Sequence, residues 1–64
     1  MYVIRRENLD TGLVGYLMLN GRYGHINDAA KFEGLNAAKM MRDSQESSYP
    51  WNPGHNFEYT IEEI

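Results

Sequence analysis

YVIRRENLDTGLVGYLML, residues 2–19, carries the strongest secondary-structure signal in the chain. Residues 2–7 are rich in β-forming side chains, and residues 13–19 are a second, more apolar run. Between the two runs, NLDTG supplies an Asn, an Asp and a closing Gly12, which is typical of a four- or five-residue hairpin loop. The sequence therefore predicts an N-terminal β-hairpin.

Residues 13–19 are unusual for a strand of a small sheet because both of their faces are apolar. Alternation separates them into two sets: Leu13, Leu17 and Leu19 against Val14, Tyr16 and Met18. A small antiparallel sheet normally shows one polar face, so we expect something beyond this chain's own helix to cover the second set. Val14, Tyr16 and Met18 are therefore candidate binding residues. We also expect a homodimer through this strand, whose edge would offer free N–H and C=O groups.

The middle of the chain predicts a helix whose continuity is open. Asn20-Gly21 is a strong turn signal that either ends the second strand or begins a short extra hairpin. Asn27 or Asp28 can then cap a helix. Gly34 weakens this helix by about 1 kcal/mol relative to Ala. One alternative is a continuous helix, and the other is a short turn at 28–33 followed by a helix over 35–45.

FEYTIEEI, residues 57–64, alternates apolar and polar side chains and predicts a half-buried third strand. The chain is thus β-β-α-β, a single domain over residues 1–64. A crossover over the first strand gives an α+β fold, with a three-stranded antiparallel sheet of order 2-1-3 and one helix on one face.

This strand order brings opposite charges together across neighbouring strands. The expected pairs are Arg5 and Arg6 with Glu58, Glu62 or Glu63. The inward positions of strands and helix predict a core of six residues: Ile4, Leu17, Phe32, Leu35, Met41 and Ile61.

Composition limits both the size and the chemistry of the protein. At 64 residues and 7.4 kDa the chain has room for one domain with a small core. It has no Cys, which removes disulfides and thiolate chemistry. Six Lys and Arg against nine Asp and Glu give a net charge of −3, which argues mildly against a protein that tracks phosphates. No run approaches the roughly 20 apolar residues of a membrane span, and we expect a cytoplasmic protein without membrane contact.

Groups that could perform catalysis are few. His25 and His55 each lie beside a Gly in a predicted loop without a helical partner, so we expect two solvated histidines and no metal site. Ser44, Ser47 and Ser48 lie at a helix exit, where hydroxyls cap and turn. The glycines form no nucleotide-binding loop. The sequence therefore predicts neither an enzyme nor a cofactor.

SSYPWNPGHN, residues 47–56, contains the only Trp and both Pro residues of the chain. The two prolines fix φ on either side of Trp51, so aromatic residues here could be held in place at low entropic cost. Two interpretations stay open: Trp51 is a lid on a small core, or it anchors a protein partner. In the second, the binding residues are Tyr49, Trp51, Asn52 and His55.

Four stretches of the chain together resemble the short hairpin-helix-strand proteins found among small phage and mobile-element reading frames. They are YVI, GYL, DAAKF and the terminal FEYTIEEI. The resemblance covers most of the chain, and such proteins are mostly accessory factors. It implies a non-enzymatic protein that binds a host protein, with inhibition of that protein as one outcome.

The alternative function is a nucleic-acid-binding module. The first two strands and the turn after them carry Arg and Tyr side chains that could form a basic, aromatic surface on which bases stack. These residues are Arg5, Arg6, Arg22, Tyr2, Tyr16 and Tyr23. The acidic third strand and the net charge of −3 argue against this alternative.

Overall fold

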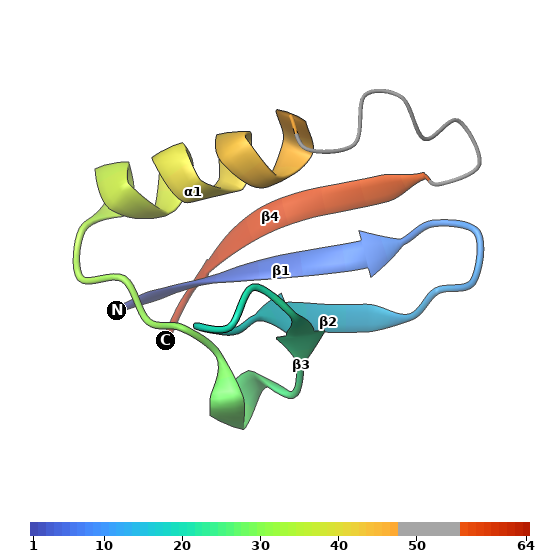
Figure 1. Cartoon of the computed structure of the whole chain (residues 1–64), viewed down its shortest axis with the longest axis horizontal. Helices are drawn as coiled ribbons and strands as arrows, with labels where there is room; N and C mark the ends of the chain where they lie inside the picture. The colour runs from blue at the N-terminus through green and yellow to red at the C-terminus, as the bar shows by residue number, and fades with distance from the viewer. Residues whose placement is uncertain (48–55) are drawn as a thin grey trace.

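The structure is a computed structural model, and it describes residues 1–47 and 56–64 (Figure 1). Its elements in chain order are β1 (Tyr2–Asn8), β2 (Val14–Leu17), β3 (Tyr23–Gly24), the 3-10 turn η1 (Ile26–Asp28), α1 (Leu35–Ser47) and β4 (Phe57–Glu63). The strands form one antiparallel sheet in the order β3-β2-β1-β4, with α1 running along one side of it (Figure 1). The predicted α+β class, with one helix and an antiparallel sheet, is confirmed.

The described sheet has four strands, whereas the sequence predicted three. The three predicted strands keep their order 2-1-3, because β1 lies between β2 and β4. The additional strand, β3, pairs with the outer edge of β2 through Leu17 with Tyr23 and Tyr16 with Gly24. The extra hairpin is therefore the correct alternative for the Asn20-Gly21 turn.

The Asn20-Gly21 turn creates β3 because its local bonds reverse the chain. Gly21 has a φ of 83°, a region that favours glycine, and its N–H donates to the Met18 carbonyl at 3.0 Å. The side-chain oxygen of Asn20 accepts the Arg22 N–H at 2.9 Å. The chain therefore reverses its direction, and β3 pairs antiparallel with β2.

The predicted β1–β2 hairpin is present. Asn8 holds its loop by accepting the N–H groups of Asp10 at 2.9 Å and Thr11 at 3.3 Å on its side-chain oxygen. Gly12 closes the loop with a φ of 77°. The hairpin aligns Arg5 with Tyr16 across the two strands.

The chain between β3 and α1 does not form one continuous helix. The turn η1 is followed by an extended segment, residues 30–32, which is hydrogen-bonded to two strands. The Ala30 N–H donates to Leu17 at 2.8 Å, and Phe32 and Tyr2 exchange two backbone bonds of 2.8 Å. Since β2 ends at Leu17, the segment takes its position beside the N-terminal end of β1. Of the two alternatives, a turn followed by a separate helix is correct, and that helix extends two residues beyond the predicted 45.

The sheet register defines which face α1 covers. Side chains of β1 alternate between the two faces, and Ile4 pairs with Ile61 of β4. By the same alternation, Leu17 and Tyr23 lie on the face of Ile4. The Tyr23 hydroxyl donates to Oε1 of Gln45 in α1 at 2.9 Å. We call this side of the sheet the helix face.

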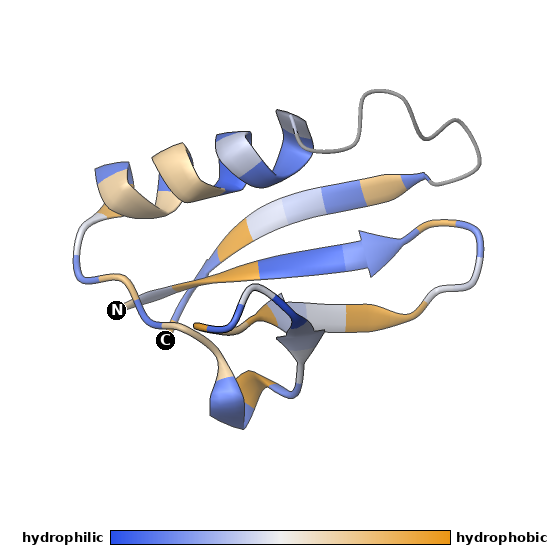
Figure 2. Cartoon of the chain, viewed as in Figure 1, coloured by the Kyte–Doolittle hydropathy of each residue, from blue (hydrophilic) through white to orange (hydrophobic). Residues whose placement is uncertain are grey.

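The core lies at the N-terminal end of β1. In Figure 2 the first half of β1 is hydrophobic and the half nearer the arrowhead is hydrophilic. The buried apolar residues of the described chain are Val3, Ile4, Leu17, Ala29, Ala30 and Ala38. Three of these six are alanines, so the core is small even for a chain of this length.

The predicted core is confirmed for Ile4 and Leu17, while Phe32 and Ile61 are half-buried. It is wrong for Leu35 and Met41, whose side chains are 41% and 37% exposed. The reason is that α1 buries only Ala38 against the sheet. Leu35 and Met41 lie three residues before and after Ala38, so they flank the contact on either side of the helix.

Candidate protein-binding surfaces

An apolar groove separates α1 from the β2–β3 turn on the helix face. It has a volume of about 270 Å³ and is lined by Leu17, Met18, Leu19, Gly21, Ala30, Phe32, Met41 and Gln45. Only Gly21 and Gln45 in this set are not apolar. We call this hollow the Met41 groove.

The Met41 groove is hollow because small residues lie between large ones. Leu17 is buried and forms part of the floor. Ala30 and Gly21 add little side-chain volume, whereas Leu19 and Met41 stand at the rim. Leu19 is 94% exposed because the turn carries it away from β2. The described part of the chain thus leaves two large apolar side chains in water beside an apolar hollow.

The predicted binding residues Val14, Tyr16 and Met18 do not form one patch. Val14 and Tyr16 lie on the face opposite α1, because they pair with Glu7 and Arg5 of β1. Met18 follows the end of β2 and lines the Met41 groove. The alternation of side chains along a strand could not predict the position of Met18, because β2 ends at Leu17 and the chain turns there.

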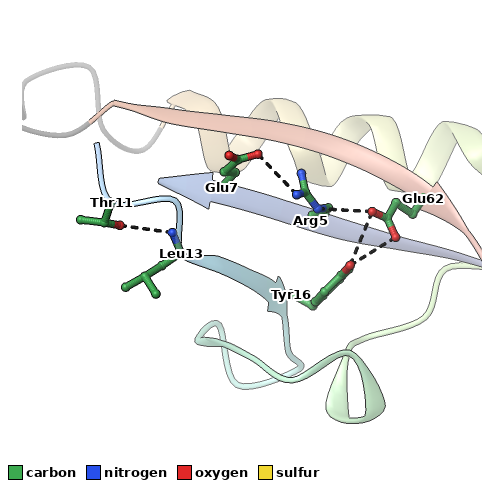
Figure 3. A network of polar contacts seen from close by, with 6 residues as sticks. All are labelled: Arg5, Glu7, Thr11, Leu13, Tyr16 and Glu62. Atoms are coloured by element: carbon green, nitrogen blue, oxygen red, sulfur yellow. Dashed lines mark hydrogen bonds and ion pairs between the residues drawn. The ribbon is translucent and has the colours of Figure 1, made fainter. Parts of the chain in front are cut away.

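A polar network covers the face opposite α1 (Figure 3). The Tyr16 hydroxyl donates to the two carboxylate oxygens of Glu62, at 3.3 and 3.5 Å. Arg5 lies 3.4 Å from Glu62 through Nε and 3.4 Å from Glu7 through a terminal nitrogen. The predicted pairing of Arg5 with a β4 glutamate is confirmed. These bonds are long and half-exposed, so each contributes at most a few tenths of a kcal/mol.

The edge of β2 is not available for pairing at Tyr16 and Leu17, because β3 occupies it there. The expectation of free backbone groups along this edge is therefore wrong for these two residues. Self-association through the side chains of this strand stays a prediction.

The Arg and Tyr residues expected to stack nucleic-acid bases lie on both faces of the sheet. Arg5 and Tyr16 lie on the face opposite α1, whereas Arg6 and Tyr23 lie on the helix face. Arg6 was also expected to pair with a glutamate of β4, but its guanidinium instead lies over the rings of Tyr23 and Phe57. The six residues thus do not form a single surface.

His25 has a structural role in the described chain. Its Nδ1 accepts the N–H of Asn27 at 3.1 Å and so caps η1. Within residues 1–47 and 56–64, no group of three His, Cys, Asp or Glu side chains could hold a metal ion. No helix in these ranges is long and apolar enough to cross a membrane. The predicted binding residues Tyr49, Trp51, Asn52 and His55 lie outside the described residues.

Sequence reasoning did not identify the Met41 groove, because its walls come from segments far apart in the chain. Periodicity assigned Met41 to the core and Leu19 to a strand. The Asn20-Gly21 signal was the one local indication that Leu19 leaves the sheet. Comparison of the chain with protein-family models, curated proteins and solved structures found no match.

Proposed function

We propose that the protein is a non-catalytic protein-binding module that receives an apolar side chain of its partner in the Met41 groove. The observation that carries this proposal is the juxtaposition of an apolar hollow of about 270 Å³ with exposed apolar residues at its rim. Burial of apolar surface stabilises association by roughly 25 cal/mol per Å². A partner that covers Leu19 and Met41 would therefore gain affinity from residues that now face water.

The chemistry of the groove favours a protein segment as its occupant. Its lining has no charged group, so it offers little to orient a polar cofactor. A hollow of this size suits one or two apolar anchor side chains, which commonly dominate binding between proteins. Met18 and Met41 are flexible and polarisable, so they can adapt to the shape of an anchor. The likeness to phage and mobile-element accessory proteins suggests a host protein as the partner, with inhibition as one consequence of binding.

A peptide library displayed on phage and selected on the immobilised chain tests the proposal across many candidate anchor side chains at once. We expect the selected peptides to share an apolar anchor. Leu19→Gln should weaken their binding at least tenfold, about 1.4 kcal/mol, because it places a polar amide at the rim of the groove.

Leu9→Gln is the matched control, because Leu9 is also exposed but does not line the groove. We expect this variant to bind within twofold of the wild-type chain. The proposal is wrong if no peptide is enriched, or if the selected peptides bind both variants with equal affinity.

A further inference from the structure

A second hollow on the molecule combines a cation with apolar walls. It has a volume of about 280 Å³ and is lined by Arg6, Asn8, Leu13, Val14, Gly15, Tyr23 and Phe57. We call it the Arg6 pocket. The hydrogen bond between Tyr23 and Gln45 links it to the Met41 groove, because Tyr23 lines the pocket and Gln45 lines the groove.

Gly15 creates the space for this pocket. It pairs with Arg6 across β1 and β2, so a side chain at position 15 would lie beside Arg6 on the helix face. A Cβ atom there would lie 3.0 Å from the Cβ of Tyr23, which is closer than such atoms normally approach. The absence of a side chain at Gly15 therefore lets Tyr23 approach β2 and lets Arg6 extend over its ring.

Two aromatic rings hold the Arg6 guanidinium in place. Its central carbon lies 3.7 Å from the ring centroid of Tyr23 and 4.4 Å from that of Phe57. Contacts of this kind engage the flat face of a guanidinium and leave its N–H groups at the rim for a ligand. The cation is thus positioned by the fold before any ligand arrives.

Arg6, unlike Arg5 and Arg42, has no acidic partner among the described residues. Arg5 pairs with Glu7 and Glu62, and Arg42 pairs with Asp43. Glu7 is adjacent to Arg6 in sequence, but alternation places it on the opposite face of the sheet. Within residues 1–47 and 56–64, the side chain of Arg6 donates no hydrogen bond.

Asn8 adds a second donor at the pocket. Its side-chain oxygen is occupied by the N–H groups of Asp10 and Thr11, which fixes the amide group. The amide nitrogen, Nδ2, makes no bond to any residue in the described part of the chain. The pocket therefore offers donors from Arg6 and Asn8 but no carboxylate.

We propose that the Arg6 pocket binds the C-terminal carboxylate of a protein whose last residue is apolar. The guanidinium fork matches the two oxygens of a carboxylate, and Leu13 and Phe57 supply apolar walls on the helix face. An apolar chain end meets both requirements, because its carboxylate and side chain branch from one Cα atom. The net charge of −3 disfavours a doubly charged phosphate more than a carboxylate. This inference deepens the proposed protein-binding function, on which it rests, by naming the end of the partner chain as a ligand.

The test uses N-acetyl-L-leucine and its neutral amide, N-acetyl-L-leucinamide, as probes for ¹⁵N chemical-shift titration of the whole chain. We expect the acid to bind with a Kd in the millimolar range, as is usual for so small a ligand, and to shift the amides of Arg6, Asn8 and Gly15. The amide probe should bind at least tenfold more weakly. Equal binding of the two probes, absence of saturable shifts up to about 20 mM, or shifts confined to other residues would overturn the proposal.

Variants separate this site from the Met41 groove. Arg6→Gln should weaken binding of the acid at least tenfold, whereas Arg22→Gln, at an exposed arginine in the β2–β3 turn, should leave it within twofold. Met41→Gln should also leave the affinity for the acid within twofold, because Met41 does not line the Arg6 pocket. A failure of the groove proposal and a failure of the pocket proposal therefore give different results. Should Arg6→Gln not fold, the comparison of the two probes on the wild-type chain decides. Tighter binding of phenyl phosphate than of the acid would contradict the choice of a carboxylate.

Discussion

Ala38 sets the distance between α1 and the sheet. It is fully buried, and it is the one buried residue of the helix. A methyl group at this position lets the helix lie close over β1 and β4, the two strands that it packs against. The close approach leaves Leu35 and Met41 at the flanks of the helix, where Met41 forms one wall of the groove.

Enlarging Ala38 should therefore destabilise the fold. We expect Ala38→Leu to lower the free energy of unfolding by about 1–3 kcal/mol, because extra methyl groups overpack the contact between helix and sheet. Ala37→Leu is the matched control, since Ala37 is exposed on the same helix, and should change stability by no more than about 0.5 kcal/mol. Urea unfolding measures both variants. Equal losses in the two would show that Ala38 does not set the contact.

At the scale of elements, the extended segment 30–32 is the feature that distinguishes this fold from a simple hairpin with a helix. It is bound to β2 through Ala30 and to β1 through Phe32. This attachment fixes the position from which α1 starts after Gly34. The segment also contributes Ala30 and Phe32 to the lining of the Met41 groove.

Hydrogen exchange tests this attachment residue by residue. The amide protons of Ala30 and Phe32 should be protected, because both donate backbone bonds of 2.8 Å. The amide of Lys31, between them, makes no bond within the described chain and should exchange much faster. A continuous helix would instead protect all three amides, so similar protection of Lys31 and Phe32 would contradict the extended segment.

The sequence predicted those elements that are stabilised by residues close to one another in the chain. NLDTG predicted the β1–β2 hairpin because Asn8 and Gly12 stabilise the loop within a few residues of each other. The order of the three predicted strands followed from one crossover. The path of residues 30–32 could not be predicted, because its hydrogen bonds reach Leu17 and Tyr2, which lie far away in sequence.

At the scale of the whole molecule, the two sides of the sheet differ in character. The side opposite α1 carries the network of Arg5, Glu7, Tyr16 and Glu62 (Figure 3). The helix face carries the Met41 groove and the Arg6 pocket. Residue types alone could not reveal this division, because the arginines and tyrosines of β1, β2 and β3 alternate between the two sides. The outer side of β2 was expected to be apolar, but it carries Tyr16, which is half-buried and donates a hydrogen bond to Glu62.

The neighbouring methionines of α1 offer the most direct test of the Met41 groove as the binding surface. Met41 lines the groove, whereas Met40 is 74% exposed and does not line it. The measurement is the Kd, by isothermal titration calorimetry, of one library-selected peptide for Met41→Gln and for Met40→Gln. We expect Met41→Gln to weaken binding at least tenfold and Met40→Gln to change it less than twofold, with the melting temperature of both variants close to that of the wild-type chain. Equal affinities for the two variants, or a greater loss in Met40→Gln, would contradict the groove as the binding surface.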